Sequence, residues 1–518
     1  MRKLIVVTAA VLAAVVVFLV GSLPPRPLHL SLDGVDGDLR RRTVTGAYHI
    51  HTNRSDGADP KPLVAAAAAR AGLTFAIFAD HGDGTRAPEA PSYIDGVLCI
   101  DAVEISTNGG HYVALALGAA PYPLGGEAAA VVEDVRRLGG FGFAAHPDHP
   151  TPELAWTDWT APIDGLEWLN ADSEWRTESR LALMRTVLSY VLRPAPAIAS
   201  VLDRPTRTLE RWDALSRTHR VVTLAAVDAH GGARTQTSER AEPRIAVGPS
   251  YETSFRALTN RVLLDRPLSG NATADASALL DAIKRGSVYS VIDAVSPDVV
   301  VDLDQLRLAS PLPAGAEVHT ITSDFGRRLE IQAAESPGDP PVPWVLTNWV
   351  YSSPFPPEAR NGPASVASAV PIAAGEWRVE KDPLSAGQIE ASGNAFTLRY
   401  SLGEGPPASQ FVAAAADFSG GGPFQVLTFK GRAPMPMRVS LQLRFPPDDR
   451  RWVKSVYLDP DERAFSIPVG ELTSAEKSDQ GMPQPESARS LLFVVDLVNA
   501  KPGYAGELTI SDLRVAGR

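Results

Sequence analysis

The stretch Phe75-Ala76-Ile77-Phe78-Ala79-Asp80-His81 predicts the fold of the first half of the chain, because an uninterrupted apolar run stops at two polar residues. Two further runs have the same form: residues 141–145 stop at His146, and residues 221–227 stop at Asp228. Such runs are typical of strands buried on both faces, as in parallel sheets. Polar residues repeated at the carboxyl ends of parallel strands mark the active face of an α/β barrel. We therefore expect a barrel with its site at that end.

A set of metal-binding side chains follows these strand ends. The set opens with a His-x-His pair, whose alternation sends both imidazoles to the same face of a strand. It holds six of the ten histidines and three carboxylates: His49, His51, Asp56, His81, Glu104, His111, His146, Asp228 and His230. Imidazole and carboxylate without thiolate suit zinc, manganese or iron, and the sequence leaves all three open. We expect two or three divalent metal ions here.

The motifs that contain these residues resemble those of the PHP family, the polymerase and histidinol phosphatase metallohydrolases. The matching strings are HIHTNRSDG at 49–57, ADH at 79–81, EISTNGGH at 104–111, HP at 146–147 and DAH at 228–230. The resemblance covers residues 43–295, about half of the chain, and implies a distorted (β/α)7 barrel. One departure is Gly82, where an Asn often follows the Asp-His pair. That departure bears on substrate contacts and not on the metals.

The resemblance also implies a role for each ligand. Glu104 would bridge a metal held by His49, His51 and Asp228 to a second one held by His111 and His146. Asp56, His81 and His230 would hold a third. Glu104, Asp228 and His81 are the expected catalytic residues, acting with a metal-bound hydroxide. Two metals about 3.5–4 Å apart would clamp the attacking and leaving oxygens of an ester.

Two arginines lie close to these motifs. Arg54 precedes Asp56 by two residues and Arg234 follows His230 by four, so both are candidates to bind a substrate phosphate. The alternative for each is a solvated loop arginine. The only cysteine, Cys99, lies in an apolar run and is expected to be a packed core thiol rather than a nucleophile.

Three functions compete. The first is an exported phosphoesterase acting on a small or glycan-attached phosphate ester. The second is a carboxylic or carbamic ester hydrolase on the same metal site. The third is a membrane-tethered glycan-binding protein with an inactive barrel. A net charge of −11 argues against nucleic acid as the main partner, since nucleic-acid binders normally carry a basic surface.

The N-terminus predicts export. Arg2-Lys3 precedes an uncharged, mostly apolar segment, residues 4–23, which is closed by Pro24-Pro25. About 20 residues can just cross a hydrocarbon core, and the basic flank should stay in the cytoplasm. Residues 1–25 are therefore a signal anchor facing the periplasm or exterior, or a cleaved signal peptide that leaves the protein secreted.

A change in residue composition and periodicity divides the chain into regions. We expect the barrel over 43–295, a small β layer over 296–354 and a connector over 355–384. Regular short strands over 385–518 predict a β-sandwich, jelly-roll-like and resembling galactose-binding domains. Within the barrel, residues 174–192 predict a helix that either caps the site or is an ordinary outer helix.

Overall fold

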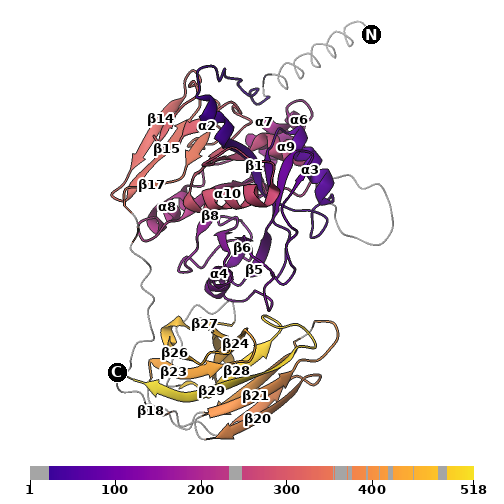
Figure 1. Cartoon of the computed structure of the whole chain (residues 1–518), viewed down its shortest axis with the longest axis vertical. Helices are drawn as coiled ribbons and strands as arrows, with labels where there is room; N and C mark the ends of the chain where they lie inside the picture. The colour runs from indigo at the N-terminus through magenta and orange to yellow at the C-terminus, as the bar shows by residue number, and fades with distance from the viewer. Residues whose placement is uncertain are drawn as a thin grey trace, which may run out of the picture. The chain divides into compact units, whose positions relative to one another are not determined.

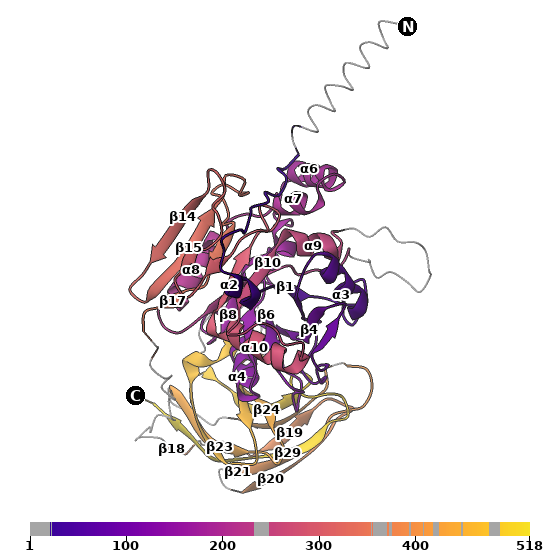
Figure 2. The same ribbon diagram turned by 45° about the horizontal axis from the view of Figure 1, so that its top comes forward.

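The computed structural model describes residues 21, 23–232, 248–353, 355, 370–371, 376–392, 395–407, 409–417, 424–446, 449–475 and 487–517. The chain divides into two compact units (Figure 1). The first comprises residues 1–82, 88–118 and 135–355, and the second residues 83–87, 119–134 and 356–518. Figure 2 shows the same units turned by 45°.

A ten-stranded mixed sheet forms one part of the first unit. Its parallel centre consists of β1 (Thr43–Ile50), β2 (Phe75–Phe78) and β4 (Val97–Asp101). The strand order is β14-β15-β16-β11-β10-β1-β2-β4-β3, with β17 paired to β15. The outer strands are β3 (Ser92–Ile94), β10 (Thr259–Leu263), β11 (Val288–Val291), β14 (Glu317–Thr322), β15 (Gly326–Gln332), β16 (Val345–Thr347) and β17 (Val350–Tyr351). The strands expected between 296 and 354 thus extend this sheet.

A five-stranded sheet completes the first unit, in the order β5-β6-β7-β8-β9. Its strands are β5 (Val103–Thr107), β6 (Gly110–Leu115), β7 (Phe141–Ala144), β8 (Gly165–Asn170) and β9 (Val222–Ala226). Two isolated parallel bridges join the two sheets, His81 to Glu104 and Ile50 to Ala229. The sheets therefore meet at the two places where strands of the expected site end.

Helices α2, α3 and α5 to α10 belong to the first unit, and α4 spans the boundary between the two units. Their bounds are α2 (Gly37–Arg42), α3 (Lys61–Arg70), α4 (Ala128–Arg137), α5 (Ala171–Glu174), α6 (Arg180–Tyr190), α7 (Pro194–Ala199), α8 (Thr206–Leu215), α9 (Tyr251–Ala257) and α10 (Ala272–Arg285). Helix α10 shows why such segments begin and end where they do. The Asn271 side chain accepts from the Ala274 amide, and Gly286 ends the helix at φ 81°.

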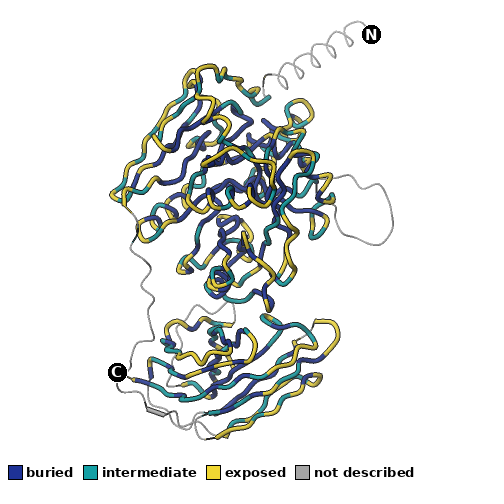
Figure 3. Tube along the Cα trace, viewed as in Figure 1, coloured by how far each residue is buried: buried dark blue, intermediate teal, exposed yellow. Residues whose placement is uncertain are grey.

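The second unit has two six-stranded antiparallel sheets and a sandwich-like core, as expected for residues 385–518. One sheet runs β20-β21-β29-β23-β26, with β18 paired to β29, and the other β19-β22-β28-β24-β25-β27. The bounds are β18 (Val370–Pro371), β19 (Arg378–Lys381), β20 (Ala386–Ser392), β21 (Ala395–Ser401), β22 (Phe411–Asp417), β23 (Val426–Arg432), β24 (Met437–Phe445), β25 (Arg450–Leu458), β26 (Arg463–Pro468), β27 (Thr473–Ser474), β28 (Ser490–Asp496) and β29 (Ala505–Ala516). Strands β18 and β19 fall inside the expected connector. Figure 3 shows the buried stretches of both units.

The fold is thus mixed α/β followed by a β-sandwich. The structure shows two sheets joined by two bridges. That these sheets form the expected (β/α)7 barrel stays a prediction. Among the described residues no helix has both the length and the apolar character that a membrane span needs. The segment expected to be a signal anchor or signal peptide, residues 1–25, lies mostly outside the described residues.

The sandwich core predicts a large loss of stability on truncating its central ring. Phe493 is fully buried, with ring centroids 5.5 Å from Phe396 and 5.2 Å from Phe429. Removing a core aromatic ring typically costs about 3–5 kcal/mol. We expect Phe493→Ala to lower the free energy of unfolding of the second unit by this amount in urea denaturation. Val498→Ala, in the same unit and 46% exposed, is the control, expected within about 0.5 kcal/mol of the unchanged protein.

Candidate metal centre

The structure brings together all nine residues that the sequence singled out as ligands. They come from strands β1, β5 and β6 and from the segments that follow β1, β2, β7 and β9: His49, His51, Asp56, His81, Glu104, His111, His146, Asp228 and His230. Strands β1, β2, β7 and β9 end at this place, as the carboxyl ends of parallel strands do. Glu104 follows directly on the end of β4, and β6 runs antiparallel to β5 and β7, so His111 near its start reaches the same edge.

Five imidazoles surround the Glu104 carboxylate. Its Oε1 lies 2.7 Å from His111 Nδ1 and 3.0 Å from His146 Nε2. Its Oε2 lies 3.0 Å from His81 Nδ1, 3.3 Å from His49 Nε2 and 3.4 Å from His51 Nε2. Glu104 itself is 1% exposed. A carboxylate that divides its two oxygens between two sets of imidazoles has the geometry of a bridge between two cations.

A second carboxylate, that of Asp228, faces His49 and His51, which also face Glu104. Its Oδ1 lies 3.2 Å from His51 Nε2 and 3.6 Å from His49 Nε2. Asp228 is buried. The four donors expected for the first metal, the two imidazoles with Glu104 and Asp228, thus lie together on the floor of the site.

Asp56 gathers the remaining ligands at the open side of the site. Its Oδ2 lies 3.5 Å from His81 Nε2 and 3.4 Å from His230 Nε2, and its Oδ1 lies 3.4 Å from His51 Nδ1. The side chains of Asp56 and His81 are 50% and 36% exposed, whereas His49 is fully buried. The cluster is therefore open to solvent on the side of Asp56 and His81.

Two buried atoms of the floor have no hydrogen-bond partner, His49 Nε2 and Glu104 Oε2. A buried polar atom without a partner costs free energy, so its persistence needs an explanation. A metal ion provides one, because imidazole nitrogen and carboxylate oxygen are metal donors. Donor atoms of three groups lie within 4.8 Å of one another: His49 with His51 and Glu104, His51 with Asp56 and His230, and His81 with Glu104 and His111. The residues fit divalent ions.

The backbone is strained at three of these residues. His49, His146 and Asp228 have φ values of 66°, 29° and 45°, in the left-handed region that side chains with a Cβ rarely adopt. His49 lies in a β-bulge, because the register of β1 with β2 shifts between Tyr48 and Ile50. The regular alternation expected for this strand is therefore broken at His49. Even so, His49 and His51 reach the same Glu104 oxygen. Strain of this kind tends to persist at functional sites.

Sequence reasoning missed the carboxylate behind His49. Glu167 in β8 is fully buried, and its Oε1 lies 2.6 Å from His49 Nδ1. Its Oε2 accepts the backbone amide of His146 at 2.7 Å and the Asn170 side-chain amide at 2.8 Å. The Asn170 amide also donates to Asp228 at 3.1 Å. The available signal was a charged residue inside the apolar strand of residues 165–169.

A second supporting carboxylate, Asp80, shapes the loop that follows His51. Its Oδ1 accepts the Thr52 amide at 2.7 Å and the Ser55 hydroxyl at 2.8 Å, and its Oδ2 accepts the Thr52 hydroxyl at 2.8 Å. Tyr251 of α9 donates its hydroxyl to the His51 carbonyl at 2.8 Å. These bonds hold the loop that carries Asp56.

The carboxylates and imidazoles shift each other's pKa values. Burial acts to raise the pKa of Glu104, but the charge of His49 and the hydrogen bonds from His111 and His146 outweigh it and hold that pKa well below its usual range. Burial acts to lower the pKa of His49, but Asp228, Glu167 and Glu104 raise it well above its usual value. These shifts favour an ionised Glu104 beside a protonated His49, so a divalent cation that binds between them would displace a proton.

The two candidate phosphate-binding arginines have different outcomes. Arg54 forms ion pairs with Glu89 and, at 3.1 Å, with Asp101, so its guanidinium is engaged away from the metal ligands. Arg234 lies outside the described residues. Cys99 is buried in β4, and burial raises the pKa of its thiol to about 11, which fits a core thiol.

No family model and no curated protein matches this chain. Among solved structures, several carbohydrate-binding modules are similar to less than a third of the chain. A family 11 module from Clostridium thermocellum in complex with a β-1,3-1,4-mixed-linked tetrasaccharide is 12% identical, over 29% of this chain and 94% of that one, with a TM-score of 0.23. A CBM4 structure is 13% identical over 27% and 86%, with a TM-score of 0.20. TmCBM61 with β-1,4-galactotriose is 11% identical over 27% and 88%, with a TM-score of 0.18. At these scores the likenesses carry no conclusion about function.

Two isosteric substitutions should separate a ligand from its support. We expect Glu104→Gln to lose bound metal, because an amide bridges two cations poorly. Glu167→Gln should keep the metal stoichiometry but lower affinity about 10–100-fold, the usual effect of losing a carboxylate behind a ligating histidine. Metal analysis after dialysis and chelator competition measures both. Full metal content in Glu104→Gln would contradict the assignment of the bridge.

The metal-free protein should lose stability as the pH rises. Burial opposes protonation of His230, but Asp56 and Asp228 raise its pKa from 6.5 to about 9. A raised pKa stabilises the fold fully below pH 6.5, and this contribution is lost as the pH passes through 9. We expect the Tm of the chelated protein to fall across this window, and His230→Gln to flatten that dependence. His319→Gln, whose imidazole lies beside Glu317 on β14, is the control that should leave it unchanged.

Proposed function

We propose that the chain is a metal-dependent hydrolase of the PHP type that cleaves a phosphate ester. The observation that carries this proposal is the buried Glu104 carboxylate, whose two oxygens face five imidazole nitrogens at 2.7–3.4 Å. An inactive relic would not need to keep a full donor set, two orphaned buried atoms and three strained ligand backbones together.

The strand connections support a distorted (β/α)7 barrel as the frame. Strand β4 leads directly into β5, which begins the second sheet, and β9 returns to β1. The return is made by the Val227 amide, which donates to the Tyr48 carbonyl at 3.1 Å, and by the His51 amide, which donates to the Ala229 carbonyl at 3.0 Å. The order β1, β2, β4–β5, β6, β7, β8, β9 supports a ring with the ligands at its rim, in which β6 alone runs antiparallel to its neighbours.

The donor set favours a phosphate ester over a neutral ester. Divalent metals, when bound, act as Lewis acids and lower the pKa of the attacking water. Three of them would bring six positive charges against the four carboxylates of Asp56, Glu104, Glu167 and Asp228, an excess of two. Charge that develops on a phosphoryl group in the transition state is best met by cations placed in advance. A carboxylic or carbamic ester needs less positive charge in the site, because it is neutral in the ground state.

The residues themselves divide the work. Asp56 and His81 lie at the exposed side and, with His230, would hold the third metal there. His49, His51 and Asp228 form the floor with Glu104, and Glu167 holds His49 through its Nδ1 atom. Burial of this floor excludes water from one side of the reacting group. The charges of the site are therefore screened less than they would be in water.

We also propose that the hydrolase is exported, since the apolar segment over residues 4–23 carries a basic flank. Its substrate would then be a small or glycan-attached ester outside the cytoplasm.

The mature N-terminus of the exported protein shows whether residues 1–25 stay as an anchor. Retention of the intact chain in membranes after an alkaline wash is expected for an anchor, and a soluble chain that begins near Leu23 for a signal peptide.

The substrate class is tested with matched leaving groups. We expect the metal-loaded protein to hydrolyse p-nitrophenyl phosphate or bis-p-nitrophenyl phosphate with a higher kcat/KM than p-nitrophenyl acetate or an aryl carbamate. Glu104→Gln should lower the phosphate-ester rate by more than about 100-fold, because loss of a ligand exceeds loss of a supporting group. Glu317→Gln, an exposed change on β14, serves as the control with unchanged rate. A better rate on the carboxylic or carbamic ester would replace this proposal by the second function.

A further inference from the structure

Helix α6 carries an unpartnered apolar face. Six large apolar side chains on α6 and the two residues after it have exposed fractions between 49% and 81%: Leu181, Met184, Val187, Leu188, Val191 and Leu192. At about 100° per residue these six positions span about 140° of the helix circumference. Scattered exposed apolar residues are ordinary in soluble proteins, but a continuous apolar stripe marks an interaction surface.

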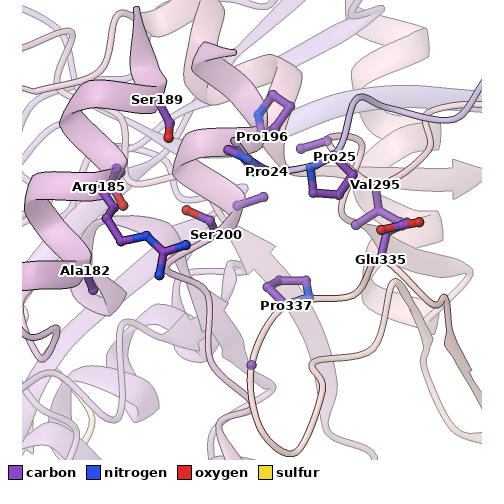
Figure 4. Close-up of a pocket in the computed structure, with 14 residues that line it drawn as sticks. Pro24, Pro25, Ala182, Arg185, Ser189, Pro196, Ser200, Val295, Glu335 and Pro337 are labelled. Carbon is purple, nitrogen blue, oxygen red and sulfur yellow. The ribbon is translucent and has the colours of Figure 1, made fainter. Parts of the chain in front are cut away.

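The other side of α6 faces the rest of the first unit. Leu183 and Tyr190 are half-buried on that side, and Tyr190 donates a hydrogen bond to α9. Ser189, also on that side, lines a pocket of about 310 Å³ together with Pro24 and Pro25 (Figure 4). Packing on a protein core needs one apolar side of a helix. The six exposed apolar side chains of α6 are therefore available for a partner outside the first unit.

The start of the described chain lies beside this helix. Arg193, just after α6, donates a hydrogen bond to the Pro24 carbonyl. The residue that follows the apolar segment 4–23 therefore lies beside the carboxyl end of α6. Any bilayer that holds this segment would lie close to α6.

Two arginines lie near the apolar face. Arg180 is exposed at the first position of α6, and Arg185 lies between the face and the pocket, which it also lines. Trp175, 40% exposed, precedes the helix. Guanidinium groups beside an apolar stripe can bind lipid phosphates, and tryptophan is enriched at membrane interfaces.

We propose that the apolar face of α6 lies in the boundary between lipid headgroups and acyl chains, so that the first unit rests on the bilayer. This inference concerns attachment and does not depend on the hydrolase activity. It predicts that the face is buried in lipid to a depth of about 5–10 Å, as for other interfacial helices.

The test uses the full chain with a fluorophore at one introduced thiol. Cys99 is buried, so Val187→Cys can be labelled selectively with an environment-sensitive dye. The labelled protein is combined with vesicles of phosphatidylcholine and phosphatidylglycerol that carry a nitroxide near the headgroup. We expect a blue shift of the emission and quenching by the nitroxide lipid. The matched control is Val350→Cys, 43% exposed on β17, which lies away from α6 in both views (Figures 1 and 2) and should show neither.

Three outcomes would overturn the proposal. The first is equal quenching at positions 187 and 350. The second is vesicle-bound protein with no quenching at 187. The third is a blue shift without vesicles that grows with protein concentration and disappears in Val191→Asp, since this would mean that a second copy covers the face. Activity of each labelled protein on a phosphate ester is measured in parallel, so failure of the attachment and failure of the hydrolase proposal stay distinguishable.

Discussion

The first unit depends on one electrostatic constraint, the charge of a carboxylate that is removed from water. Glu104 is 1% exposed, and an ionised carboxylate in such a place is costly unless positive charge surrounds it. Five imidazoles approach its two oxygens from β1, β6 and the ends of β2 and β7. The need to bring these groups to one point explains why two sheets meet here, with bridges at His81 and Ala229.

A second layer of polar groups makes that convergence specific. Glu167 holds His49 and the His146 amide, and Asn170 connects Glu167 to Asp228. Because every one of these groups is buried, each lost hydrogen bond would leave a polar atom without a partner. The left-handed backbone at His49, His146 and Asp228 persists because the strands and this network over-determine those positions. The geometry is therefore set before any metal binds.

The same unit presents a chemically different surface at α6. There large apolar side chains such as Val187 and Val191 lie on the surface. A continuous apolar surface of this kind is normally covered by another molecule, which removes it from water. A hydrolase held against a bilayer by this face would meet substrates at or near the membrane, and the open side of its metal site is formed by Asp56 and His81.

The sequence by itself determined the nine candidate ligand positions, the apolar strands before them and the β-rich second half, because these features rest on local periodicity and on residue chemistry. Tertiary structure decided the rest. The pairing of Arg54 with Asp101 and the support of His49 by Glu167 depend on contacts between residues dozens of positions apart. Which Glu104 oxygen faces which imidazole depends on how several strands meet. The outward face of α6 could not be predicted either, since an apolar stripe at helical spacing is the same in sequence whether it meets a protein core or solvent.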